Sequence, residues 1–174
     1  MKVNIVLIGM PGSGKTTLGR LLSRELSLDF IDIDIEIERY SQQKISQLFE
    51  KGEAHFRKIE TVVTKTRADA DAAVISTGGG VILRPENMAA LKAKGFVVFL
   101  NRNLEDITDN LRIDSRPLLK EGVGRLKQLH DERIDLYHQY ADLTIENNHS
   151  LKETLTQLIE QLPPALKKGQ TNET

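Results

Sequence analysis

The chain has 174 residues, which suits one compact domain. Hydrophobic residues make up 39% and charged residues 28%, a balance that provides a core and a polar surface and excludes disordered and fibrous classes. Lysine and arginine total 24 against 25 aspartates and glutamates, so the basic excess typical of nucleic-acid binding is absent. We therefore expect no nucleic-acid partner.

Residue usage excludes several further classes of protein. There is no cysteine, which excludes disulfides, thiolate nucleophiles and cysteine-bound zinc, and the four histidines lack the spacing of a metal motif. No apolar run approaches the roughly 20 residues that a membrane helix needs. We therefore expect a cytoplasmic protein without a membrane partner, and the near-neutral charge favours a monomer.

The predicted elements alternate along the chain between strands and helices. An apolar run over 3–8 predicts a buried strand, and a glycine-rich loop and a helix over 15–27 follow it. Further strands are expected at 29–33, 73–76, 96–100 and 143–146, and further helices at 35–40, 45–51, 53–68, 85–94, 104–111, 123–140 and 151–162. This alternation predicts an α/β fold, with a parallel sheet that carries helices on both faces.

The same reading gives the domain organisation. Residues 1–162 form a single domain, in which a charged segment containing glycine, at about 112–124, is interpreted as a mobile lid. Residues 163–174 are polar, contain two prolines and lack apolar periodicity, so we expect a disordered tail.

Residues 9–16, Gly-Met-Pro-Gly-Ser-Gly-Lys-Thr, match the phosphate-binding pattern G-x-x-x-x-G-K-[ST] between a predicted strand and a predicted helix. Backbone N–H groups and the positive end of the helix would surround phosphate oxygens, with Lys15 at the β and γ phosphates and the Thr16 hydroxyl on magnesium. A glycine turn with a coincidental lysine is the alternative. The pattern predicts that a nucleoside triphosphate binds at Gly12, Ser13, Gly14, Lys15, Thr16 and Thr17.

Asp32 and Asp34 stand two residues apart at the end of the second predicted strand, which would turn both carboxylates toward the phosphate loop. One carboxylate would hold magnesium, and the other would orient an acceptor hydroxyl and take its proton. The third predicted strand ends at Thr77 without an acidic residue, which favours Asp32 for the metal. The alternative is a solvated strand end with a helix cap.

Three further features indicate an acceptor site. Residues 78–80 are all glycine, so the backbone can approach a small ligand closely, although a tight turn would also explain them. Arg57 and Arg133 are candidates to bind an anionic acceptor, with solvated helix arginines as the alternative. Arg116 in the predicted lid would bring a positive charge to the transferring phosphoryl group.

Together these motifs resemble those of the shikimate kinase family over about residues 4–162. The features that match in order and approximate spacing are the phosphate loop, Asp32-Ile33-Asp34, Phe56-Arg57 with Ile59-Glu60, Gly78-Gly79-Gly80, Arg116-Pro117-Leu118-Leu119, and Arg133 with Tyr137. The resemblance implies a P-loop fold like that of nucleoside monophosphate kinases, with a five-stranded parallel sheet ordered 2-3-1-4-5. It also implies magnesium-dependent transfer of the ATP γ-phosphoryl group to the 3-hydroxyl of shikimate, a step in aromatic amino acid biosynthesis.

The resemblance further implies roles in the chemistry. Thr16 and Asp32 would serve magnesium, and Asp34 would contact the acceptor hydroxyls and act as the base. Lys15 and Arg116 would neutralise the charge that develops on the phosphoryl group.

For the substrates, the resemblance implies that Arg57 and Arg133 bind the shikimate carboxylate and that Gly79 and Gly80 contact the ring hydroxyls. Many members place an adenine-stacking arginine seven residues before the Arg-Pro pair of the lid, where this chain has Asp109. Arg112 would take over that role through a reorganised loop.

Other kinases share parts of the pattern. Adenylate kinase has a similar loop with proline before Gly-Ser-Gly-Lys, and gluconate kinase is a short chain with a lid. The paired aspartates and the glycine run suit a polyhydroxylated acceptor better than a nucleotide. Another small-molecule kinase such as gluconate kinase, or a nucleotide-binding switch without transfer, are the alternatives to shikimate kinase.

Overall fold

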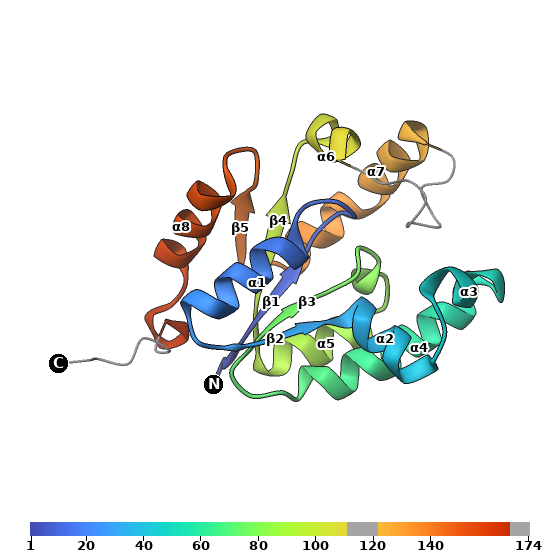
Figure 1. Ribbon diagram of the computed structural model, residues 1–174, viewed down its shortest axis with the longest axis horizontal. Coiled ribbons are helices and arrows are strands. Elements are labelled where there is room, and N and C mark those ends of the chain that lie inside the picture. The colour runs from blue at the N-terminus through green and yellow to red at the C-terminus, as the bar shows by residue number, and fades with distance from the viewer. Residues whose placement is uncertain (111–121, 168–174) are drawn as a thin grey trace.

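The computed structural model describes residues 1–110 and 122–167. Five parallel strands form one sheet ordered β2-β3-β1-β4-β5 (Figure 1). They are β1 (Asn4–Ile8), β2 (Asp29–Asp32), β3 (Ala73–Ser76), β4 (Gly95–Asn101) and β5 (Leu143–Glu146). The parallel sheet predicted from the alternation and the strand order implied by the resemblance are both confirmed.

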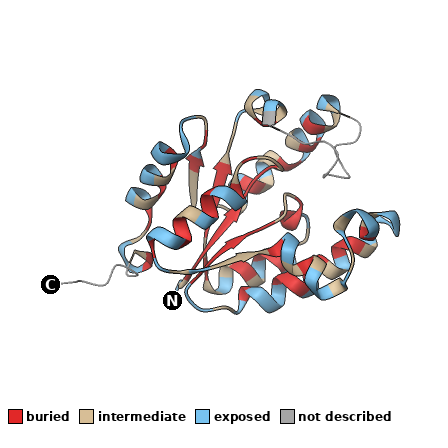
Figure 2. Ribbon diagram, in the orientation of Figure 1, coloured by how far each residue is buried: buried red, intermediate tan, exposed pale blue. Residues whose placement is uncertain are grey.

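Helices cover both faces of the sheet because successive strand residues point to opposite sides. In β1, Ile5 and Leu7 pack under α1 (Lys15–Glu25) and α8 (Leu151–Gln161), whereas Val6 and Ile8 face the opposite core. That second core contains residues of α4 (Glu53–Ala68), α5 (Pro85–Lys94) and α7 (Val123–Tyr140). The buried strands between half-buried helices are visible in Figure 2.

The shorter elements connect this framework. They are α2 (Ile33–Ser41), α3 (Ile45–Glu50), the 3-10 turn η1 (Val81–Leu83), α6 (Leu104–Asn110) and the 3-10 turn η4 (Pro164–Leu166). Within the ranges that the structure describes, no helix is both long enough and apolar enough to cross a membrane.

The second strand ends two residues before one of the two aspartates expected on it. Asp32 Oδ1 accepts hydrogen bonds from the backbone N–H groups of Asp34 and Ile35, at 3.0 and 3.3 Å, and so caps α2. Asp34 therefore lies in the first turn of the helix. The prediction that both carboxylates share one face of a strand was wrong, because capping by Asp32 starts the helix at once.

The expected disordered tail is also corrected in its first part. Pro164–Leu166 form a 3-10 turn, Leu166 is 5% exposed, and this leucine packs in the core under α1 and α8. Leu166 thus anchors this segment to the core, a contact that its polar composition did not indicate. Residues 168–174 lie outside the described range.

The sheet order determines where a ligand can bind. Strands β3 and β4 flank β1 on opposite sides, so the chain changes direction across the sheet at β1. Crevices outside the carboxyl ends of parallel strands at such a switch point are the usual binding places of α/β folds. The glycine-rich loop that follows β1 lies at this point (Figure 1).

Candidate active site

The loop between β1 and α1 folds around the ammonium group of Lys15. Lys15 is 7% exposed, and its Nζ donates to the carbonyl oxygens of Gly9 and Met10, both at 2.8 Å. Gly12 and Gly14 have φ angles of 79° and 95°, a region that side chains disfavour. Gly9, the first glycine of the phosphate-binding pattern, also has a positive φ, of 152°, so the backbone conformation favours glycine at all three positions.

The start of α1 faces the end of β2. Thr16 Oγ1 donates to Asp32 Oδ2 at 2.8 Å, so the hydroxyl and carboxylate that the resemblance assigns to magnesium lie next to each other. Among the described residues, no group of three or more acidic, histidine or cysteine side chains could hold a metal ion. A hydroxyl and one carboxylate fit Mg²⁺, which is usually held by few protein ligands together with phosphates and water.

A polar cavity of about 250 Å³ joins the phosphate loop to the acceptor side. Asp34 enters it from α2, opposite Lys15 and Thr16. Its lining residues are Gly12, Gly14, Lys15, Thr16, Thr17, Asp34, Thr77, Gly78, Gly79 and Arg102. Asp34 thus reaches the predicted space, although from a helix instead of a strand.

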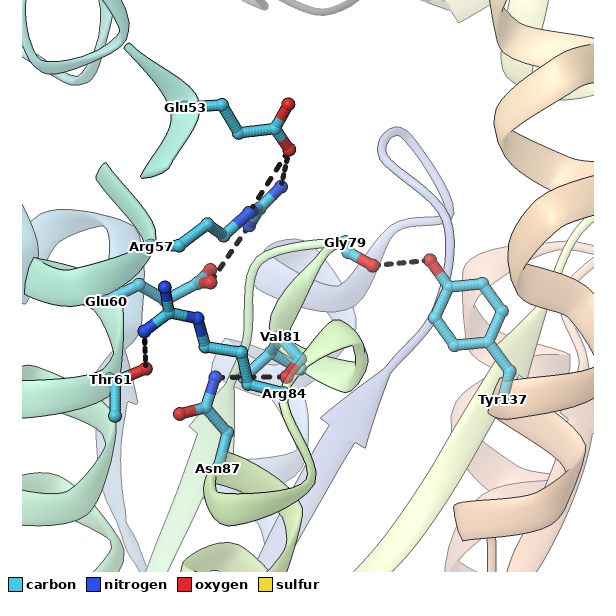
Figure 3. A network of polar contacts seen from close by, with 9 residues as sticks. All are labelled: Glu53, Arg57, Glu60, Thr61, Gly79, Val81, Arg84, Asn87 and Tyr137. Carbon is cyan, nitrogen blue, oxygen red and sulfur yellow. Dashed lines mark hydrogen bonds and ion pairs between the residues drawn. The ribbon is translucent and has the colours of Figure 1, made fainter. Parts of the chain in front are cut away.

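Arg57 on α4 is buried beside the glycine run. Its Nη1 donates to Glu60 Oε1 at 2.9 Å and its Nη2 to Glu53 Oε1 at 3.2 Å (Figure 3). The guanidinium carbon also lies 5.1 and 5.9 Å from the ring centroids of Phe56 and Phe49. With 7% exposure, Arg57 is not a solvated helix arginine.

The three glycines after β3 fill spaces that a side chain would not fit. A Cβ atom on Gly80 would lie 2.3 to 2.5 Å from the Arg57 guanidinium, and one on Gly79 would lie 2.7 Å from the Pro11 side chain. A Cβ on Gly78 would lie 3.1 Å from Asp34 Oδ1. None of the three glycines has a positive φ. The run does form a tight turn, in which the Gly78 carbonyl accepts a hydrogen bond from the Val81 N–H at 3.2 Å. Because no φ angle there is positive, close packing and not the backbone conformation favours glycine at these positions.

Tyr137 approaches the glycine run from α7, opposite α4 (Figure 3), and Arg133 lies one turn earlier on α7. Arg133 is 2% exposed, and within the described part of the chain its Nε and Nη1 atoms have no hydrogen-bond partner. Tyr137 donates its hydroxyl to the Gly79 carbonyl oxygen at 2.6 Å (Figure 3). A buried cation with unpartnered N–H groups is suited to bind an anion, since burying an unpaired charge is costly.

Burial controls the protonation of two groups here. Desolvation raises the pKa of Glu60, against the opposing effect of the Arg57 charge and hydrogen bond. Desolvation also raises the pKa of the Tyr137 phenol to about 12, although the Arg133 charge acts in the opposite direction. Tyr137 is therefore a neutral donor to Gly79 at ordinary pH.

Some residues of the site were not assigned a role from the sequence. Glu60 and Tyr137 occur in the motifs of the resemblance without a stated role. In the structure both are buried, Glu60 pairs with Arg57, and Tyr137 bonds to Gly79. Arg102 follows β4 directly and lines the cavity. In the sequence, the one sign of this role was its position at the carboxyl end of a central strand. Arg112 and Arg116, which the sequence placed at the nucleotide and the phosphoryl group, lie outside the described residues.

Comparisons with known proteins identify the family. The sequence model described as shikimate kinase matches residues 11–163. A shikimate kinase from Clostridium beijerinckii is 42% identical, over 92% of this chain and 95% of that protein. One from a Sulfurihydrogenibium species is 38% identical, over 95% of this chain and 98% of that protein.

A solved structure agrees with the sequence match. The shikimate kinase from Acinetobacter baumannii, in complex with shikimate, superposes with a TM-score of 0.87 at 37% identity and covers 92% of each chain. The family model thus matches most of the chain, the relatives are about 40% identical to it, and the fold is shared. The chain belongs to the shikimate kinase family.

Proposed function

We propose that the chain transfers the γ-phosphoryl group of MgATP to the 3-hydroxyl of shikimate, and that the residues assembled around the cavity carry this reaction. The observation that supports the assignment is that one cavity is lined both by Lys15 and Thr16 and by Asp34 and Gly79. A phosphate-binding loop and an acceptor surface thus share one space. Membership of the shikimate kinase family supports the choice of acceptor.

On the nucleotide side, the backbone N–H groups of the phosphate loop and the positive end of α1 bind the ATP phosphates. The loop glycines Gly12 and Gly14, with Ser13, supply the backbone, and Thr17 contacts the same phosphates. Thr16 and Asp32 would hold magnesium, which neutralises phosphate charge when it is bound. Arg102 provides a further cation on this side of the cavity.

On the acceptor side, the buried guanidinium groups of Arg57 and Arg133 bind the shikimate carboxylate. Each presents planar N–H groups that match a carboxylate, and both are held in water-poor surroundings where such pairs are strong. The backbone of Gly79 and Gly80 contacts the ring hydroxyls. The solved relative from Acinetobacter baumannii holds shikimate, which supports an acceptor site of this chemistry.

Asp34 is the residue that takes the proton from the 3-hydroxyl as the hydroxyl oxygen attacks the γ-phosphorus and the bond to ADP breaks. Phosphoryl transfer has a loose transition state, so most of the catalysis comes from positioning and charge neutralisation. Lys15 and Arg116 supply positive charge to the transferring group, and Arg112 covers the adenine. We assign both arginines to the lid expected at about 112–124, of which Val123 and Gly124 belong to α7, in a monomeric, cytoplasmic single-domain kinase.

The test is magnesium-dependent release of ADP from ATP, with shikimate, gluconate and AMP offered separately. We expect turnover with shikimate alone and formation of a phosphate monoester detectable by ³¹P NMR. Turnover with gluconate would move the acceptor assignment to gluconate kinase. ATP binding without turnover on any of the three would indicate a nucleotide-binding switch and would overturn the acceptor site.

A further inference from the structure

The phosphate loop is held from outside by a residue of the connection between β5 and α8. Asn147 follows β5 directly and is 7% exposed. Its Nδ2 donates to the carbonyl oxygen of Ser13 at 2.8 Å, and its Oδ1 accepts from Thr154 Oγ1 on α8 at 2.9 Å. The Asn147 backbone N–H donates to the Asn101 carbonyl at the end of β4, at 2.6 Å. The two side-chain contacts fix the orientation of the amide, and the backbone contact fixes the position of the residue.

The contact with Ser13 determines which way a peptide group of the loop points. In a trans peptide, the C=O and the following N–H lie on opposite sides. Because Asn147 holds the Ser13 carbonyl on the outside, the N–H of Gly14 is turned to the other side, toward the cavity that Gly14 lines. That N–H is one of the donors expected to contact phosphate.

This orientation needs a restraint. Gly14 has a φ of 95°, and rotation of the Ser13–Gly14 peptide by half a turn would bring φ into the ordinary negative range. The rotated peptide would present the Ser13 carbonyl oxygen to the cavity and repel a phosphate. Glycine itself offers little resistance to this rotation. The hydrogen bond from Asn147 to the Ser13 carbonyl opposes it, because the rotation would break that bond.

Packing at the same point gives independent support. A Cβ atom on Gly14 would lie 2.8 Å from Asn147 Nδ2, so the amide packs directly on the glycine backbone. Ser13 itself is fully buried. Removal of the amide would therefore free the space beside Gly14 and allow the Ser13–Gly14 peptide to rotate.

We infer that Asn147 is a positioning residue for the nucleotide, which holds the Gly14 N–H in the direction that receives a phosphate oxygen. This rests on the proposed function, in that it assumes that the loop binds ATP. Asn147 is not among the residues that line the cavity, and it acts through the Ser13–Gly14 peptide. No effect on the acceptor side is expected.

The experiment compares Asn147→Ala with Asn4→Ala. Asn4 is a matched control, because it is also buried and bonds two backbone groups, Ala70 O at 2.6 Å and Ala73 N at 2.9 Å, at the amino end of the central strand β1. Both variants should lower the melting temperature. Calorimetric titration with MgADP should give about a tenfold or greater rise in Kd for Asn147→Ala alone, the loss of one charge-assisted hydrogen bond, with the shikimate KM changed less than twofold.

A spectroscopic readout isolates the peptide itself. Residues 13–14 are the one Ser-Gly pair in the sequence, so ¹³C-carbonyl serine combined with ¹⁵N-glycine selects the Gly14 amide. MgADP should shift this signal strongly in the unaltered protein and weakly in Asn147→Ala. Thr154→Val removes only the hydroxyl that orients the amide and should raise the Kd about threefold, which also tests the inference if Asn147→Ala folds poorly.

The outcomes separate the two proposals. An unchanged MgADP Kd in Asn147→Ala and Thr154→Val, or an undiminished shift of the Gly14 signal, would overturn the inference while leaving the kinase assignment intact. Failure of the unaltered protein to bind MgADP would instead refute the proposed function and this inference together.

Discussion

Asp34 lies in the first turn of α2 and lines the cavity with Lys15. If it takes the proton of the acceptor hydroxyl, Asp34→Asn removes the base and keeps the size of the side chain. We expect kcat to fall by roughly 10² to 10⁴, measured as shikimate-dependent ADP release. The Kd for MgADP should stay within twofold, and unchanged turnover would remove this role from Asp34.

Arg133 presents unpartnered N–H groups, among the described residues, from a position that is 2% exposed. Arg133→Ala should weaken shikimate binding by about 1.5 to 3 kcal/mol, the value of a hydrogen bond to a charged group. Titration calorimetry with shikimate measures this directly. Arg67→Ala is a suitable control, since Arg67 is on the exposed surface of α4 and pairs there with Glu36. Equal shikimate affinity in both variants would contradict the contact.

The Tyr137 phenol links protonation to stability. Its pKa is raised by burial to about 12, from an ordinary value of 10.0, so the unfolded chain loses this proton before the folded protein does. The free energy of unfolding therefore falls as the pH rises from 10 to 12, by up to about 3 kcal/mol from this group.

Tyr137→Phe isolates that effect. At pH 8 the variant should be less stable by about 1 to 3 kcal/mol, because the half-buried Gly79 carbonyl loses its donor. Urea unfolding, followed by circular dichroism because the chain has no tryptophan, should show this deficit shrink between pH 10 and 12. A constant deficit would mean that the phenol is not held neutral.

Individual site residues could be predicted from the sequence where they belong to a recognisable motif. The phosphate loop, the aspartate pair, the glycine run and the two arginines follow from the sequence, and the structure brings Asp34, Gly79 and Lys15 to one cavity. Asn147 was not foreseeable, because its role depends on which loops meet in space, and the only signal for Arg102 was its position after a central strand. Asparagine and arginine in polar loops carry no pattern of their own.

Among the elements, the glycine run between β3 and η1 gives the sharpest test of close packing. Gly80→Ala leaves an allowed backbone, with φ at −97°, but its Cβ would displace the Arg57 guanidinium from its place between Glu53 and Glu60. We expect the shikimate KM to rise at least tenfold with little change in MgADP affinity. Gly124→Ala, whose Cβ would meet no atom within 4 Å, should change neither. A Gly80→Ala enzyme with the original shikimate KM would show that Arg57 does not need this position.

Strands and helices were predicted well because their apolar periods differ. The strands of the sheet read as short apolar runs, and the helices repeat apolar residues every three to four positions. The error at the end of β2 has a specific cause. Asp32 satisfies two backbone N–H groups of α2, and that capping contact competes successfully with extension of the strand.

For the whole molecule, the segment after α8 contributes to stability. Removing residues 163–174 exposes the surface that Leu166 covers and should lower the free energy of unfolding by roughly 1.5 to 3 kcal/mol. Removing only 168–174 should leave it unchanged within about 0.5 kcal/mol. Urea unfolding of the two truncated proteins checks this, and equal stability would show that Leu166 adds nothing to the core.

The contact between Pro11 and Gly79 has a consequence for how the two substrates influence each other. Pro11 belongs to the loop assigned to ATP and Gly79 to the run assigned to shikimate, and Tyr137 bonds Gly79 while it also contacts Met10 at 3.8 Å. We expect a displacement of Met10 or Pro11 to reach Gly79, and the reverse, through these packed atoms. Thermodynamic linkage then requires symmetry: if bound nucleotide changes the affinity for the acceptor by some factor, bound acceptor changes the affinity for the nucleotide by the same factor.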